Sequence, residues 1–176
     1  MTSTFRALPL VWFTLALTVV ILSSNILVQT PINDWLTWGA ITYPFSFLIT
    51  DLANRYFGKA FARQVVYVGF IIAVVLSAWY ATPRIGAASG LAFLTAELLD
   101  VGIFDRLRQK AWWQAPLIST LVASIVDTAV FFTLAFYGTE MPWITLALGD
   151  LAVKFALALV TLLPFRAALL LYRPSP

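Results

Sequence analysis

The sequence predicts an all-α membrane protein of six transmembrane helices, and three observations support this fold class. First, 61% of the 176 residues are hydrophobic, only 11% are charged, and the mean hydropathy is +0.91. Soluble domains carry about 25% charged residues, and a chain of this length cannot bury so much apolar surface in one water-soluble core. Second, the apolar residues fall into six segments of membrane-spanning length. Third, the basic residues between these segments fall almost entirely on one side.

Each predicted helix is apolar and bounded by turn residues. A crossing needs about 20 mostly apolar residues, and without water in the bilayer core each crossing must satisfy its own backbone, as an α-helix does. Turn residues such as Pro31, Gly58, Pro83 and Gly138 separate the segments. The first segment is too long for a signal peptide and no small-residue cleavage site follows it, so we expect it to be retained. In order, the helices cover 8–30, 35–54, 61–81, 84–104, 113–137 and 143–165, within a single domain of residues 1–176.

The positive charges predict the orientation of these helices. Lys and Arg are in excess in cytoplasmic loops. With six crossings, Arg84 stands alone on one side, Lys154 lies inside the sixth crossing, and the remaining basic residues share the opposite side. Both termini are therefore expected in the cytoplasm. The basic residues on that side are Arg6, Arg55, Lys59, Arg63, Arg106, Arg108, Lys110, Arg166 and Arg173.

The residue types present exclude several functions. The chain has no Cys and no His, so disulfides, thiolate metal sites and histidine general bases are ruled out, and we predict no cofactor and no metal. The net charge of +3 is attributed to the cytoplasmic loops, so no nucleic-acid partner is expected. An intramembrane enzyme would need paired carboxylates such as Glu97 and Asp100, but these lie on one helix and such dyads usually converge from separate elements. We therefore expect a protein that is not an enzyme.

Ionisable residues inside the apolar segments are the strongest functional signal. A charge near the middle of a bilayer costs at least about 2.5 kcal/mol, so it marks a functional site by default. From the helical rise, Asp127, Lys154 and Glu97 lie roughly 15, 17 and 20 Å from the outer ends of their helices, which places them in one layer near the midplane. We expect Glu97 and Asp127 to line a polar cavity.

The other polar residues in the segments admit more than one interpretation. Asp100 follows Glu97 at i+3, on the same helix face and nearer the cytoplasm. Asp51 is as consistent with capping a helix as with a functional role. Asn25 and Gln29 share one face of the first helix, one turn apart and near the outer side. Lys154 follows Asp150 at i+4, the favourable order for a helical ion pair, so this pair either neutralises itself or belongs to the site.

Several strings resemble one family. Residues 43–52, Tyr-Pro-Phe-Ser-Phe-Leu-Ile-Thr-Asp-Leu, followed by Arg-Tyr-Phe-Gly-Lys at 55–59, are similar to the central signature of the queuosine precursor transporters, the vitamin-uptake-type family of bacterial inner membranes. The resemblance runs from about residue 22 to 165. The strings that fit downstream are Pro-Arg-Ile at 83–85, Ala-Ser at 88–89, Glu-Leu-Leu-Asp-Val at 97–101, Ser-Thr at 119–120, Asp-Thr at 127–128 and Ala-Phe-Tyr-Gly-Thr at 135–139.

The resemblance implies a function and a substrate. It implies uptake of 7-cyano- and 7-aminomethyl-7-deazaguanine, and an architecture similar to the substrate-binding subunits of energy-coupling-factor transporters. A carboxylate can accept both the ring N–H and the amino group of a guanine-like base, so we expect Glu97 first and Asp127 second in that role. Asn25 or Gln29 would bind the ring carbonyl. Phe45, Phe93 and Phe131 are candidates for stacking on the base, and Asp51, Asp100 and Lys154 complete the candidate site.

The energy source stays open between two schemes. No nucleotide-binding Gly-x-x-x-x-Gly-Lys-Ser/Thr motif is present, so the chain does not hydrolyse ATP itself. It is either a stand-alone carrier, with proton coupling through Glu97, Asp100 or Asp127, or a substrate-binding subunit that needs an ATPase partner. The related subunits carry an Ala-x-x-x-Ala pattern on the first helix, whereas here Val20 follows Ala16. This difference favours the stand-alone carrier.

We predict that Glu97→Gln abolishes uptake while leaving expression and membrane insertion intact, because an amide replaces a group that only accepts hydrogen bonds. The measurement is queuosine in tRNA from cells that cannot make 7-deazaguanines and are fed 7-cyano-7-deazaguanine. Rescue by both wild type and variant would remove Glu97 from the functional residues.

Overall fold

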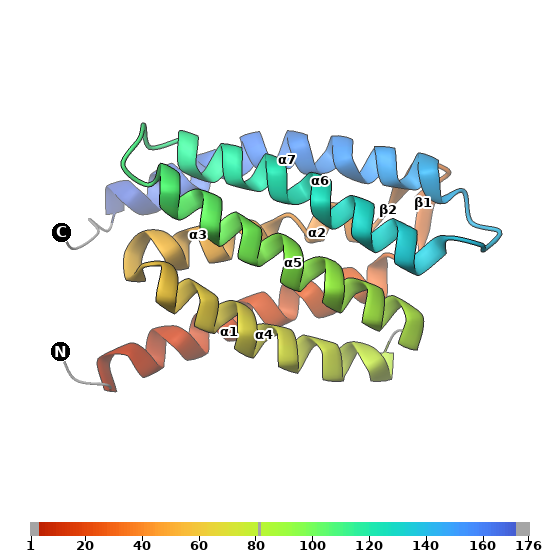
Figure 1. Ribbon diagram of the computed structural model, residues 1–176, viewed down its shortest axis with the longest axis horizontal. Helices are drawn as coiled ribbons and strands as arrows, with labels where there is room; N and C mark the ends of the chain where they lie inside the picture. Colours follow the sequence, from red (N-terminus) through yellow and green to blue (C-terminus); the bar gives the residue numbers. More distant parts are fainter. Residues whose placement is uncertain (1–3, 81, 172–176) are drawn as a thin grey trace.

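The computed structural model describes residues 4–80 and 82–171, and this part of the chain is nearly all helical (Figure 1). Ala81, the expected end of the third helix, and Arg173 lie outside the described residues. Besides the helices there is one short antiparallel hairpin, β1–β2. The elements are α1 (Thr4–Leu27), β1 (Pro31–Asn33), β2 (Leu36–Thr37), α2 (Gly39–Thr42), α3 (Phe45–Phe57), α4 (Lys59–Tyr80), α5 (Pro83–Leu107), α6 (Gln114–Phe136) and α7 (Trp143–Leu171).

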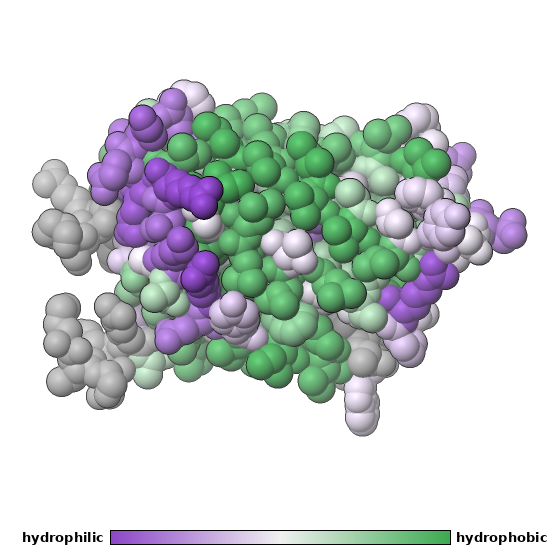
Figure 2. All heavy atoms as spheres, viewed as in Figure 1, coloured by the Kyte–Doolittle hydropathy of each residue, from purple (hydrophilic) through white to green (hydrophobic). Residues whose placement is uncertain are grey.

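Five helices of the described part are long and apolar enough to cross a membrane. The crossing segments are Ala7–Leu27, Lys59–Leu76, Pro83–Leu107, Gln114–Phe136 and Trp143–Leu171. They coincide with five of the six predicted helices. Figure 2 shows a broad hydrophobic band around the middle of the molecule, with hydrophilic residues gathered at both ends. The chain is therefore a multi-pass membrane protein.

The second predicted helix, over 35–54, is not continuous. Its first residues belong to the β1–β2 hairpin, and the rest is divided into the four-residue α2 and the 13-residue α3. Proline causes the division, because Pro44 has no backbone N–H to donate. The backbone there tightens, and Ser46 N bonds Tyr43 O, three residues back, over 2.9 Å. Together α2 and α3 lead the chain from the hairpin back towards the end of the molecule where α1 begins (Figure 1).

Two glycines allow this broken segment to pack closely against its neighbours. A Cβ added at Gly39 would lie 2.8 Å from the carbonyl oxygen of Ser24 on α1. A Cβ added at Gly149 on α7 would overlap the carbonyl oxygen of Trp35. The side chain of Asn33 shapes the turn between the strands, since its Oδ1 accepts hydrogen bonds from Trp35 N and Leu36 N over 2.9 and 3.0 Å. The hairpin and α2 are thereby held against α1 and α7.

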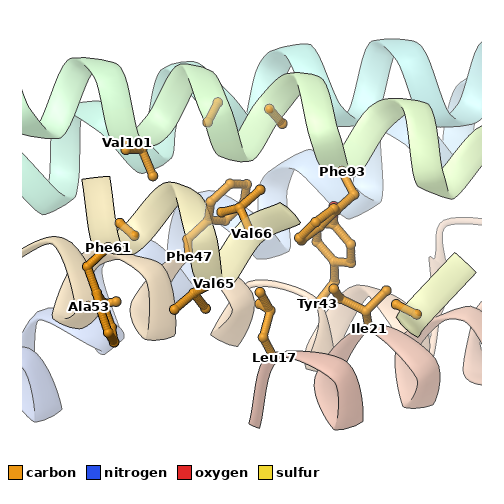
Figure 3. Close-up of a cluster of buried hydrophobic side chains, with 14 residues drawn as sticks. Leu17, Ile21, Tyr43, Phe47, Ala53, Phe61, Val65, Val66, Phe93 and Val101 are labelled. Carbon is orange, nitrogen blue, oxygen red and sulfur yellow. The ribbon is translucent and has the colours of Figure 1, made fainter. Parts of the chain in front are cut away.

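The largest apolar core lies between α1, α3, α4 and α5 (Figure 3). Phe47, Phe61 and Phe93 are among its largest fully buried side chains. Tyr43 belongs to this cluster as well, so the core reaches the point where α2 and α3 meet. A second apolar cluster joins α5, α6 and the start of α7 through residues such as Phe132 and Leu146. The polar residues of interest lie between these two clusters.

At one end of the molecule, basic residues tie α3 and the start of α4 to the end of α5. Arg55 donates to the carbonyl oxygen of Arg108 over 2.9 Å, and Arg108 donates back to that of Arg55 over 2.6 Å. Lys59 Nζ lies 3.6 Å from Asp105 Oδ2. Both contacts are partly exposed, so they contribute little to stability individually. They fix α3 at the end where α1 begins and α7 ends (Figure 1).

We predict that Gly149→Ala lowers the free energy of unfolding by about 1–3 kcal/mol, because overpacking against Trp35 forces backbone shifts. Thermal unfolding in detergent measures the loss. Gly102→Ala on α5 is the matched control, since a Cβ there meets nothing within 4 Å. The control should be neutral or slightly stabilising. Equal stability of both variants would contradict the close approach of α7 to the hairpin.

Candidate functional site

The described part encloses a polar pocket between α1, α2, α5, α6 and α7. The space among its lining side chains totals about 310 Å³, part of which is open to solvent. The wall combines apolar surface with amide, hydroxyl, carboxylate and ammonium groups. The lining residues are Ser24, Asn25, Val28, Gly39, Tyr43, Ser89, Asp127, Phe131, Asp150 and Lys154.

Five side chains form an ion network along one wall of the pocket. Lys154 Nζ lies 2.7 Å from Asp127 Oδ2 and 2.6 Å from Asp150 Oδ2. Lys154 also donates to Thr128 Oγ1 over 3.0 Å, and Thr128 donates to Asp150 Oδ2 over 2.8 Å. Tyr43 Oη donates to Asp127 Oδ1 over 2.7 Å. With both acids ionised, one ammonium faces two carboxylates and the network carries one excess negative charge.

The sequence explains only part of this network. The Asp150–Lys154 contact is the predicted i,i+4 pair on α7 and is confirmed. Asp127 comes from α6, and its pairing with Lys154 was not predicted. All three side chains are buried, and burying charges is costly unless they are paired and hydrogen-bonded. The network therefore satisfies the charges of α6 and α7 jointly.

The opposite wall of the pocket is neutral and polar. Ser89 Oγ on α5 donates to Asn25 Oδ1 on α1 over 2.7 Å. Ser24 Oγ donates to the carbonyl oxygen of Gly39 over 2.9 Å, which joins α1 to α2. Phe131 supplies an aromatic ring to the same pocket. The pocket thus brings together carboxylates, an amide and an aromatic face, the groups that a planar polar base requires.

A second polar group, the acid cluster, consists of Asp51 on α3 with Glu97 and Asp100 on α5. All three are buried, with at most 3% of any of these residues exposed. Thr50 Oγ1 donates to Glu97 Oε2 over 2.7 Å. Asp100 repels both Asp51 and Glu97 electrostatically, so the three carboxyls lie near one another. None of them lines the pocket.

The structure separates the eight predicted site residues into three groups. Asn25, Asp127 and Lys154 line the pocket. Asp51, Glu97 and Asp100 form the acid cluster. Gln29 and Phe45 belong to neither: the Gln29 side chain bonds its own helix at Asn25 O over 3.2 Å, and Phe45 is 40% exposed.

The candidates for stacking also differ in position. Phe131 lines the pocket, whereas Phe93 lines a smaller neighbouring hollow together with Asn25 and Ser89. Phe93 stacks parallel to Phe70 of α4, with the ring centroids 6.5 Å apart. Phe131 is therefore the aromatic residue placed to face a molecule in the pocket.

Six pocket residues were missing from the predicted site: Ser24, Val28, Gly39, Tyr43, Ser89 and Asp150. Tyr43 and Ser89 lie in the strings that carry the family resemblance, but only their neighbours were assigned roles. Asp150 was interpreted as the partner of Lys154. A signal was available for Tyr43, because the tyrosine directly before Pro44 sits where a proline interrupts the helix.

These features define a multi-pass membrane protein with a polar pocket between its helices. The family model described as "Putative vitamin uptake transporter" matches residues 37–82 and 76–169. The chain therefore belongs to this family, as the resemblance implied. No solved structure matches it significantly. Among the described residues, no group of three or more His, Cys, Asp or Glu side chains is placed to hold a metal ion.

The chain is similar to three curated relatives over most of their length. It is 36% identical to the "Queuosine precursor transporter" of Escherichia coli, over 95% of this chain and 89% of the relative. It is 33% identical to the "Probable queuosine precursor transporter" of Haemophilus influenzae, over 88% and 83%. A protein of the same name from Bacillus subtilis is 26% identical, over 72% and 68%.

We predict that Lys154→Met lowers the free energy of unfolding by about 3–5 kcal/mol, because it leaves two buried carboxylates unpaired. Adding Asp127→Asn and Asp150→Asn to the same chain should recover most of the loss, since no unpaired charge then remains. Denaturation in detergent compares the two. If Lys154→Met alone is as stable as the wild type, Lys154 does not neutralise the network.

Proposed function

We propose that this protein imports 7-deazaguanine precursors of queuosine across the bacterial inner membrane and is not an enzyme. The observation that carries the proposal is a pocket with two carboxylates and an amide inside a membrane-spanning bundle, in a family whose relatives carry the queuosine precursor transporter name. Charged groups are costly at this position. Ligand recognition accounts for their presence.

The chemistry of the pocket suits a guanine-like base. A carboxylate that accepts a ring N–H and an exocyclic amino group together forms strong, charge-assisted hydrogen bonds. The bonds that hold Asp150 both reach Oδ2, which leaves Oδ1, with its two lone pairs, to accept both donors of the solute. Asp127 uses one oxygen for Tyr43 and the other for Lys154, so it positions the network. We therefore assign base recognition to Asp150, in place of the first candidate Glu97.

The neutral wall completes the proposed site. Asn25 and Ser89 face the pocket and can bind the ring carbonyl of the base, since amides and hydroxyls both donate and accept. Phe131 offers a face for stacking, an interaction worth about 1–3 kcal/mol per base. In this site Asp150 accepts from the N–H and amino groups of the base, Asn25 binds its ring carbonyl, and Phe131 stacks on its ring.

The proposed topology has six crossings with both termini in the cytoplasm. The α2–α3 segment supplies the sixth crossing, although it is divided and too short to qualify as a single apolar span. Support comes from the start of α1 and the end of α7, which lie at the same end of the molecule (Figure 1). The same end carries Arg55, Arg108 and Lys59, as the bias of basic residues towards the cytoplasm requires.

The proposed mode is that of a stand-alone carrier. The absent nucleotide-binding motif leaves no ATP hydrolysis by this chain. Coupling to protons through buried carboxyls would supply the driving force without an ATPase partner.

We predict that Asp150→Asn reduces uptake of 7-cyano-7-deazaguanine about 10- to 100-fold, which corresponds to the loss of a charged hydrogen bond worth about 1.5–3 kcal/mol. Lys154 keeps Asp127 as its partner in this variant, so the protein should still fold. Queuosine in tRNA is measured over a range of external solute concentrations. Asp34→Asn, an exposed carboxylate in the hairpin turn, is the control and should match the wild type. Wild-type uptake by Asp150→Asn would exclude Asp150 from the site.

A further inference from the structure

The acid cluster of Asp51, Glu97 and Asp100 has too few hydrogen-bond donors. Four of its oxygens, one on Asp51, one on Glu97 and both on Asp100, accept no well-formed hydrogen bond in the part of the chain that the structure describes, although Ser119 lies close enough to Asp100, and Thr120 to Asp51, to interact. Buried polar atoms are almost always paired, so each exception calls for a physical explanation. A proton bound to a carboxyl converts an acceptor into a donor, which corrects this shortage.

The cluster also has no cation beside it among the described residues. The Lys154 ammonium is engaged by Asp127 and Asp150, and Lys59 pairs with Asp105 at the end of the molecule. Arg63 on α4 is exposed. Three neighbouring buried carboxylates cannot all be ionised without a positive charge, because desolvation and mutual repulsion both oppose it. Bound protons are the simplest source of that charge.

A buried hydroxyl on α3 provides an independent sign of a ligand. Ser46 is fully buried, and its Oγ makes no well-formed hydrogen bond although it lies close enough to Glu97 to interact with its carboxyl. A hydroxyl oxygen can accept from a protonated carboxyl and can donate to an ionised one. Ser46 therefore suits a carboxyl that alternates between these two states.

We propose that the acid cluster is a proton-binding site, separate from the solute pocket, that carries one proton inward with each solute. The inference rests on the proposed import function and adds its driving ion. The α2–α3 segment connects the two sites, because Tyr43 at its break lines the pocket while Thr50 and Asp51 reach the cluster. A change in the pocket is transmitted along this rigid segment to the carboxyls.

Other titratable groups face the cluster and belong to its electrostatic environment. Asp127 from α6 and Tyr43 from the α2–α3 break both interact with Glu97. Asp127 is held by Lys154, and through it by Asp150 on α7. Occupation of the pocket therefore changes the electrostatic field at the cluster, and the coupling of the two sites follows.

The experiment uses the purified full-length chain in lipid vesicles, with 7-cyano-7-deazaguanine as the probe and no ATP. The vesicles are acidic outside by one pH unit, and the membrane potential is clamped at zero. One proton per solute predicts about tenfold accumulation of the solute inside, since one pH unit corresponds to a tenfold ratio. A pH dye trapped in the wild-type vesicles should report acidification of the interior when the solute is added outside.

Two variants separate proton coupling from solute binding. Asp100→Asn and Asp51→Asn should lose the accumulation driven by the pH gradient but keep the exchange of labelled for unlabelled solute across the membrane. Asp105→Asn, on the same helix but outside the cluster, is the control and should keep both. Retained accumulation in both cluster variants would overturn the proposal.

The wild type alone also decides the question if the variants fail to fold. Solute exchange without pH-driven accumulation, or accumulation that follows a sodium gradient instead, overturns the proton site and leaves the import function standing. Neither exchange nor accumulation overturns the import function, and the proton site with it. Accumulation with acidification of the interior supports both.

Discussion

Lys154 binds the carboxylates of Asp127 and Asp150, and most of the polar interior depends on this contact. It pairs with Asp150 on its own helix, α7, and with Asp127 on α6, a helix that has no basic residue of its own. Asp127, fixed in this way, accepts the hydroxyl of Tyr43 and so anchors the break between α2 and α3. One wall of the pocket is thereby set by a buried ammonium. Such pairs contribute little net stability after desolvation, so their value here is the arrangement that they enforce.

The divided α2–α3 segment is the second feature on which the pocket depends. A continuous helix would place its side chains in a fixed 3.6-residue pattern. The interruption at Pro44 instead brings Tyr43 to the pocket and leaves α3 to present Thr50 and Asp51 to α5. Gly39 and Gly149 permit the close contacts with α1 and α7 that this path requires. A short, irregular segment thus borders both polar sites.

Sequence reasoning predicted what depends on composition and helical spacing. Hydropathy predicted the apolar helices and the polar residues within them. The 3.6-residue repeat of the α-helix predicted the Asp150–Lys154 pair. It did not predict which helix faces contact each other in the folded protein. The spacing gave Glu97 and Asp127 similar depths, but depth does not say which face of a helix meets which neighbour, and Glu97 turns towards Thr50 rather than the pocket. The interruption at Pro44 was visible in the sequence, yet the apolar character of 35–54 favoured one continuous helix.

The separation of the two polar sites gives each a distinct role. The pocket offers an acceptor, an amide and an aromatic face to a planar solute, whereas the acid cluster offers three buried carboxyls with four oxygens that accept no well-formed hydrogen bond. A carrier that performs both tasks in one bundle needs them close enough to influence each other and far enough apart for separate occupation. Tyr43 and Asp127 of the pocket interact electrostatically with Glu97 of the acid cluster.

The central claim is that the pocket binds a 7-deazaguanine, and calorimetric titration of the purified protein with 7-cyano-7-deazaguanine tests it most directly. The account predicts one site per chain and much weaker binding of an analogue that lacks the exocyclic amino group, because a carboxylate in the pocket would lose its donor. Absence of binding by folded protein, or equal affinity for the analogue, would contradict it.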